Sequence, residues 1–126
     1  MRCLIVDDNA GFLAAARKLL EGDGVTVVGV ASSSAEAVRL ADELRPDVTL
    51  VDIDLGTENG FELVERLHQA GAPSAAILIS AHSAEDFNDP IANSSAVGFV
   101  AKSDLSSDAI RDLLRGSAVL QEGDDR

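Results

Sequence analysis

The chain has 126 residues, of which 46% are hydrophobic, so it can bury the core of one domain and is too apolar for a disordered segment. Its formal net charge of −12, from 22 acidic and 10 basic residues, argues against direct binding to nucleic acid or to an anionic membrane. With four Phe and neither Trp nor Tyr, it also has no aromatic platform on which bases could stack.

The only cysteine, Cys3, lies in the first apolar run, where we expect a small buried hydrophobic residue rather than a reactive thiol. A single cysteine can form no internal disulfide, which suits a reducing compartment. No charged and apolar leader precedes the first run, and no run approaches the roughly 20 residues of a membrane span. We therefore expect a cytoplasmic protein that does not enter a membrane.

Apolar runs alternate with amphipathic segments along the whole chain. Strands are predicted at residues 2–6, 25–30, 48–52, 76–80 and 97–101. The third of these is apolar until its last residue, Asp52, which is typical of a strand buried on both faces of a parallel sheet. Five strand–helix units in series predict an α/β fold, with a doubly wound parallel sheet covered by helices on both faces.

The first three helices are predicted from apolar residues at helical spacing and from the residues that begin or end helices. In chain order we expect residues 12–20 with a stop at Gly22 or Gly24, residues 34–44 with Ser34 as the cap and Pro46 beyond, and residues 61–67 followed by Gly71.

The sequence predicts the last two helices with unequal strength. Residues 83–95 contain Pro90 and several Asn and Ser residues, which are poor helix formers, so we expect the fourth helix to be short, broken or mobile. The fifth helix has its apolar residues at 105–114 and should stop at Gly116. We therefore assign residues 1–118 to one domain and residues 119–126 to a polar tail that frays.

Chemically active side chains stand at the carboxyl ends of four predicted strands. Asp7 and Asp8 follow the first strand, Asp52 ends the third, Ser80 ends the fourth and Lys102 follows the fifth. Doubly wound sheets bind ligands outside the carboxyl ends of their strands, so these side chains are candidates for one site. If the first and third strands are neighbours, three carboxylates converge and repel one another unless a cation or a proton joins them.

Over essentially its whole length the chain resembles the receiver domain of two-component response regulators. The resemblance rests on Asp7-Asp8, residues 46–53, Gly60, Ser80-Ala81 and residues 98–102, and residues 102–105 are most similar to receivers joined to LuxR-type helix-turn-helix output domains. It implies a flavodoxin-like sheet with strand order 2-1-3-4-5. It also implies that Asp52 accepts a phosphoryl group from a histidine kinase or a phosphotransfer protein. Such a domain catalyses only its own phosphorylation and dephosphorylation.

The acidic residues suit Mg²⁺, which prefers oxygen ligands in octahedral geometry and keeps several waters. Asp8 and Asp52 would ligate the ion directly, and Asp7 would hold one of its waters. The backbone carbonyl of Asp54 would supply a third protein oxygen. The ion would cancel charge on both the nucleophile and the phosphoryl oxygens.

Lys102 and Ser80 would contact the remaining phosphoryl oxygens, the lysine as a point charge and the serine as a hydrogen-bond donor. If Ser80 moves toward a phosphoryl group on Asp52, it leaves space into which Phe99 can rotate, as the resemblance implies. The face formed by the fourth helix, the fifth strand and the fifth helix would then be the switched surface.

Several positions depart from the family pattern or leave alternatives open. Asp54 and His82 match positions that tune the rate of dephosphorylation in receivers. Ser103 stands where receivers usually have proline, so the Lys102–Ser103 peptide is either trans or strained. The weak fourth helix puts the usual dimer surface in doubt and leaves a homodimer open. Phe99 could also be an ordinary core residue.

Purely structural roles for the acidic residues, and other functions for the chain, are also open. Asp7 and Asp8 could cap the first helix, but a cap does not account for Asp52. The chain could control transcription through an output domain or a partner. It could instead be a Mg²⁺-dependent phosphatase or phosphotransferase that forms an aspartyl phosphate, or a docking module that needs no phosphorylation. The complete set of acids, hydroxyl and lysine favours the phosphorylated receiver.

Overall fold

The computed structural model describes residues 1–71, 74–82 and 88–124. Its elements are β1 (Arg2–Val6), α1 (Ala10–Gly22), β2 (Thr26–Ala31), α2 (Ser34–Leu44), β3 (Val48–Asp52), β4 (Asp54–Leu55), β5 (Glu58–Asn59), α3 (Gly60–Gln69), β6 (Ala75–Ser80), α4 (Asn88–Ala92), β7 (Gly98–Ala101), the 3₁₀ turn η2 (Lys102–Asp104) and α5 (Ser107–Asp124). Five parallel strands form one sheet in the order β2-β1-β3-β6-β7, and β4 and β5 form a small antiparallel pair. Since β6 and β7 are the fourth and fifth predicted strands, the predicted α/β class and the order 2-1-3-4-5 are confirmed.

The strands lie where the sequence is continuously apolar, and β3 is buried along its whole length. Four predicted strand limits are wrong by one residue, because pairing with a neighbour decides where a strand starts and ends. The end of β2 lies one residue late, at Ala31, opposite Val6. β2 begins at Thr26, opposite Arg2, and β7 begins at Gly98, opposite Ile77. β6 starts one residue early, at Ala75. Hydropathy alone does not contain this register information.

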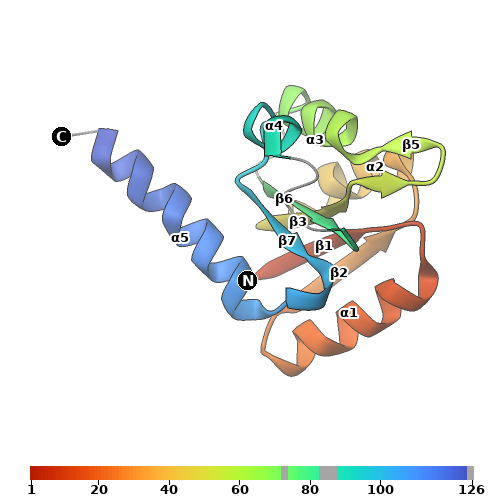
Figure 1. Ribbon diagram of the computed structural model, residues 1–126. Helices are drawn as coiled ribbons and strands as arrows, with labels where there is room; N and C mark the ends of the chain where they lie inside the picture. The colour runs from red at the N-terminus through yellow and green to blue at the C-terminus, as the bar shows by residue number, and fades with distance from the viewer. Residues whose placement is uncertain (72–73, 83–87, 125–126) are drawn as a thin grey trace.

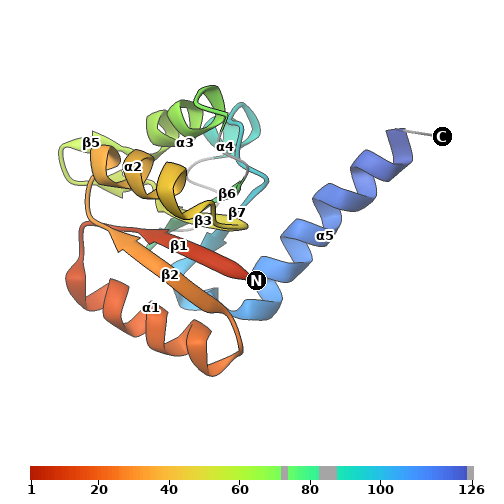
Figure 2. The same ribbon diagram turned by 180° about the vertical axis from the view of Figure 1, so that it is seen from behind.

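Helices cover both faces of the sheet (Figure 1). α1 and the first turns of α5 lie on one face, and α2 and α3 lie on the other, with α4 next to α3 (Figures 1 and 2). One core joins Leu20 of α1 and Ile110 of α5 to the sheet, and the second joins Ala41 of α2 and Leu63 of α3 to it. With both faces buried, the carboxyl edge of the sheet is left for a site.

Short polar side chains begin the helices. Asn9 caps α1, since its side-chain oxygen accepts from the Phe12 N–H, so neither Asp7 nor Asp8 is the cap. Ser33, not Ser34 as predicted, caps α2. Ser33 has an extended backbone and its hydroxyl accepts from the Glu36 N–H, which makes Ser34 the first helical residue. Two adjacent serines offer the same side chain, and only the backbone conformation selects one.

The end of α1 resolves the choice between two glycines. The helix ends at Gly22, but the chain reverses at Gly24, whose φ is +87°. The Val25 N–H then donates to the Leu20 carbonyl at 3.0 Å, which closes the last turn.

α4 and α5 differ in length more than the sequence suggests. α4 has five residues, which confirms a short fourth helix, and residues 83–87 of the predicted segment lie outside the described residues. The predicted stop of α5 at Gly116 is wrong. Gly116 is not among the glycines with positive φ, so the helix continues to Asp124, through most of the expected polar tail. Leu105 precedes this helix rather than beginning it.

α5 is also the longest helix, and its second half extends away from the sheet in both ribbon views (Figures 1 and 2). Despite this length, neither α5 nor any other helix in the described ranges is apolar enough over a sufficient length to cross a membrane.

Candidate functional site

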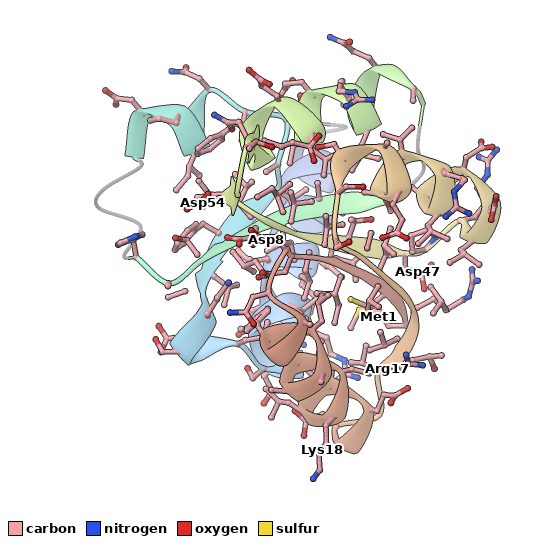
Figure 3. All side chains as sticks on the ribbon, turned by 90° about the vertical axis from the view of Figure 1, so that its right-hand side faces the viewer. Met1, Asp8, Arg17, Lys18, Asp47 and Asp54 are labelled. Carbon is pink, nitrogen blue, oxygen red and sulfur yellow. The ribbon has the colours of Figure 1, made fainter. Side chains whose placement is uncertain are left out.

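The parallel register brings the predicted site residues to one edge of the sheet. Val6 pairs with Val51, so Asp7 follows one strand beside Asp52 at the end of the next. The adjacent strand β6 ends at Ser80, which pairs with Ala101, and Lys102 follows directly. Figure 3 shows Asp8 and Asp54 at this edge, whereas Asp47 lies at the start of the strands, where its carboxylate accepts from the Arg2 N–H. Side chains from four separate parts of the sequence therefore meet here.

The predicted convergence of three carboxylates is confirmed. One oxygen from each of Asp7, Asp8 and Asp52 lies within 4.8 Å of the others. Asp7 is fully buried and Asp52 is 5% exposed, while Asp8 is exposed to solvent. Three acids this close can share a divalent cation, which makes the cluster a candidate metal site.

Two of these carboxylates are oriented by the backbone just beyond them. The Asn9 N–H donates to Asp7 Oδ1 at 2.8 Å, and the Asp54 N–H donates to Asp52 Oδ1 at 3.2 Å. Asp7 Oδ2 is buried and accepts no hydrogen bond from the described residues. Its contact is the ion pair with Lys102 Nζ at 2.6 Å. Each of these two acids thus keeps one oxygen for a cationic partner.

Lys102 extends its ammonium between the two buried acids. Nζ lies 2.6 Å from Asp7 Oδ2 and 3.4 Å from Asp52 Oδ2, and the lysine side chain is 19% exposed. Burial alone would lower the pKa of Lys102, but its close pairing with Asp7 and the charge of Asp52 outweigh burial and raise the pKa. The ammonium therefore stays charged where it lies, beside both carboxylates at the cavity.

The pKa of Asp52 moves from 3.8 to about 6. Burial is the largest cause, followed by the charge of Asp7, and the Lys102 ammonium and the Asp54 N–H pull the pKa partly back. An acid that is costly to ionise by itself becomes easier to ionise when a cation joins it. This is the electrostatic behaviour that the sequence predicts for the pocket.

A cavity of about 200 Å³ opens onto these groups and is also lined by Asp54, Ser80 and His82. Ser80 is buried, and its hydroxyl accepts from the His82 N–H at 3.0 Å. Asp54 and His82 are exposed at the cavity. Phe99 is half-buried and packs with the core on the α2–α3 face, and it lines a groove of about 440 Å³ between β7 and α5.

The described residues contain no cis peptide bond, so the Lys102–Ser103 peptide is trans, the first of the two alternatives. The turn η2 follows directly and places Lys102 at its start.

Comparison with known proteins agrees with this geometry. A model of the family named response regulator receiver domain matches residues 3–115. The chain belongs to this family. The receiver domain is 28% identical to the DNA-binding transcriptional activator EvgA of Escherichia coli over 81% of its own length and 50% of the relative's. It therefore spans about half the length of the curated relatives it matches.

Solved structures similar to this receiver domain include two from the same family. The signal receiver domain of NarL from Mycobacterium tuberculosis has a TM-score of 0.80 at 26% identity, and the match covers 93% of this chain and 95% of that one. A LuxR-family two-component response regulator from Aurantimonas sp. SI85-9A1 has a TM-score of 0.76 at 28% identity, with 97% and 85% covered. The fold and the receiver family are thus established together.

Two residues of the receiver domain matter more to the site than the sequence suggests. The sequence marks Gly60 only as part of the family resemblance, but a Cβ there would lie 2.1 Å from the Asp52 carbonyl oxygen. Phe12 was expected on the core face of the first helix, and its ring centroid lies 4.3 Å from Lys102 Nζ. The available signal was the position of Phe12 in the first turn of α1, four residues after Asp8, which places it near the carboxyl edge.

Proposed function

We propose that this receiver domain accepts a phosphoryl group on Asp52 from a histidine kinase or a phosphotransfer protein, with Mg²⁺ as cofactor. One observation supports this most strongly. Asp52 is a nearly buried carboxylate that lines a cavity, lies 3.4 Å from the Lys102 ammonium, and has an oxygen within 4.8 Å of an oxygen of each of two further acids. The domain catalyses its own phosphorylation and dephosphorylation and no other reaction.

In the transfer, an Asp52 carboxylate oxygen forms the new O–P bond as the P–N bond of the donor phosphohistidine breaks. The donor imidazole keeps the electron pair of that bond and is neutralised by a proton. Lys102 is placed to offset the charge of one phosphoryl oxygen, since its ammonium already lies 3.4 Å from Asp52 Oδ2. Ser80, buried at the cavity, would donate a hydrogen bond from its hydroxyl to another phosphoryl oxygen.

The acidic cluster fits Mg²⁺ in its chemistry. All the available ligands are hard oxygens, and the buried Asp7 Oδ2 already binds a cationic group, the Lys102 ammonium at 2.6 Å. Asp8 and Asp52 would hold the ion directly, Asp7 through water, and Asp54 through its backbone carbonyl. When bound, Mg²⁺ neutralises negative charge on the nucleophile and on the phosphoryl group.

Phosphorylation would be communicated by Ser80 and Phe99 to the face formed by α4, β7 and α5. Phe99 already lines a groove between β7 and α5, so a change in its position alters that face. We propose that the switched face acts on an output domain or a partner, which includes a second copy of this chain, to control transcription in the cytoplasm. EvgA, of whose length the match covers 50%, supports this by its description as a DNA-binding transcriptional activator.

The test is incubation with Mg²⁺ and acetyl phosphate, followed by intact mass measurement. We expect one acid-labile phosphoryl adduct on the wild-type chain and none on Asp52→Asn. Asp42→Asn is the matched control, because Asp42 is an exposed acid on α2 that does not line the cavity, and it should leave the adduct in place. Asp54→Asn is measured beside it, since Asp54 is expected to tune the rate at which the adduct is lost. A wild-type chain without an adduct, or an equal adduct on Asp52→Asn, would overturn the proposal.

The same samples test the enzymatic alternative. Asp54 lies two residues beyond the nucleophile and faces the cavity, where it could act as the acid that a phosphatase needs. Multiple turnover of varied phosphate esters, lost in Asp54→Asn, would favour that function over the receiver.

A further inference from the structure

The Lys102 ammonium has a third neighbour besides its two carboxylates. Nζ lies 4.3 Å from the centroid of the Phe12 ring, well inside the roughly 6 Å within which a cation is attracted to an aromatic face. The lysine is only 19% exposed, so water weakens this attraction less than it would on an open surface. The ring thus contacts the same charged group on which phosphoryl transfer depends.

Phe12 is held in this place by the start of α1. The Asp7 carboxylate accepts from the Asn9 N–H, and the Asn9 side chain accepts from the Phe12 N–H. The Phe12 ring meets Lys102, and Lys102 pairs with Asp7. These four contacts link the residues in a closed loop that includes the ammonium. Asp7, which pairs with the lysine, therefore also positions the Phe12 ring through Asn9.

The ring differs from the carboxylates in one decisive way. A cation in the cavity competes with Lys102 for the oxygens of Asp7 and Asp52, and phosphorylation consumes an Asp52 oxygen. Both ion pairs of the lysine are therefore disturbed during the reaction. The Phe12 ring offers no oxygen to a metal and takes no part in the bond changes, so its attraction for the ammonium persists.

We propose that Phe12 is a positioning residue, which keeps the Lys102 ammonium over the cavity when its carboxylate partners are engaged elsewhere. This rests on the proposed phosphorylation of Asp52. A ring that served only to fill the core would act through its shape, whereas a positioning ring acts through the electron density of its face. The two roles are separable by experiment.

The experiment replaces Phe12 with phenylalanines bearing one, two and three ring fluorines, which keep the ring in place but withdraw electron density from its face. The rate of adduct formation with acetyl phosphate and Mg²⁺ should fall stepwise, to about a fifth of the wild-type rate with three fluorines. Phe12→Leu should lower it about tenfold, and Phe12→Tyr should restore most of it. The same fluorine series at Phe61, which packs on the opposite face of the sheet, is the control and should leave the rate unchanged.

An NMR measurement examines the contact before any phosphorylation. The Lys102 methylene protons nearest Nζ should be shifted by the ring current in the wild type and in Phe12→Tyr, and should lose that shift in Phe12→Leu. A flat rate across the fluorine series, on a chain that does form the adduct, would overturn the role of Phe12 alone. A wild-type chain without an adduct would overturn the proposed function, and the positioning role with it, even if the ring-current shift is present.

Discussion

Two regions of the domain adjoin strand β7, the acidic edge and the α4–β7–α5 side, and they differ in how tightly their residues are fixed. At the acidic edge, defined by Asp7, Asp8, Asp52 and Lys102, two acids are nearly or fully buried and paired with one ammonium. On the α4–β7–α5 side, α4 has five residues and α5 extends beyond the sheet (Figure 1). In the proposed function the chemistry would need fixed distances and the signal would need an element that can change position, and these two requirements would fall on different regions of the domain.

A Gly→Ala substitution made in each region should give the largest difference between the two in the free energy of unfolding. Gly60→Ala places a Cβ 2.1 Å from the Asp52 carbonyl oxygen, and backbone cannot yield, so we expect a loss of about 3 kcal/mol in the free energy of unfolding. Gly98→Ala meets a Leu113 methyl at 2.6 Å, and this side chain can rotate away, so we expect about 1 kcal/mol. Urea unfolding of both variants measures the difference. Equal losses would mean that the two regions are equally rigid.

Removing the ammonium from the acidic edge should have the next largest effect on the free energy of unfolding. Lys102→Met leaves Asp7 and Asp52 without their ammonium and should lower the free energy of unfolding by about 2 kcal/mol near pH 8. Because Lys102 lowers the pKa of Asp52, its removal raises that pKa further above about 6. Asp52 is then mostly protonated near pH 5, and the loss should shrink there.

Urea unfolding at the two pH values tests this. Lys18→Met is the matched control, since Lys18 is exposed on α1 (Figure 3) and should change stability little at either pH. A loss that is the same at both pH values would contradict the assignment to Asp52.

Asp52→Asn should stabilise the metal-free domain. The pKa of Asp52 in the folded state is about 6, above the ordinary value of 3.8. Between pH 3.8 and about pH 6 the folded state therefore keeps a proton that the unfolded state has released. Stability therefore falls as pH rises through that window and stays lower above it. Removing the charge should add about 1 kcal/mol near pH 8 and clearly less near pH 5.

Thermal or urea unfolding of the two proteins at both pH values provides the measurement, and Mg²⁺ should stabilise the wild type more than Asp52→Asn. A variant that is less stable than the wild type near pH 8 would show that the buried carboxylate contributes favourably by itself.

The smallest effect is expected on the other side of the domain. Glu65 of α3 accepts from the Ser95 N–H at 2.8 Å and from its hydroxyl at 2.7 Å, which joins α3 to the segment before β7. Glu65→Ala should change the free energy of unfolding by no more than about 0.5 kcal/mol, because the contact is exposed. Amide hydrogen exchange at Ser95 should nevertheless become faster. Unchanged exchange would mean that this segment is held by other contacts.

The fold was predictable from the sequence because five apolar runs and their intervening helices are strong patterns. Predictions failed where a local signal has two solutions. Gly116 permits a helix to end but does not force it to, and α5 continues through it. Ser33 and Ser34 are equally good caps in sequence, and the backbone selects Ser33. Strand ends moved by one residue because pairing partners set them.

For the site, the sequence by itself determined which groups exist and at which strand ends they stand: Asp7, Asp8, Asp52, Ser80 and Lys102. Their roles stay predictions until phosphorylation is measured. Only the tertiary structure decided that Asp7 pairs with Lys102 at 2.6 Å, that Gly60 lies against the Asp52 carbonyl, and that the Phe12 ring faces the ammonium. These contacts join residues distant in the chain through side-chain direction and close packing, which no local sequence pattern specifies.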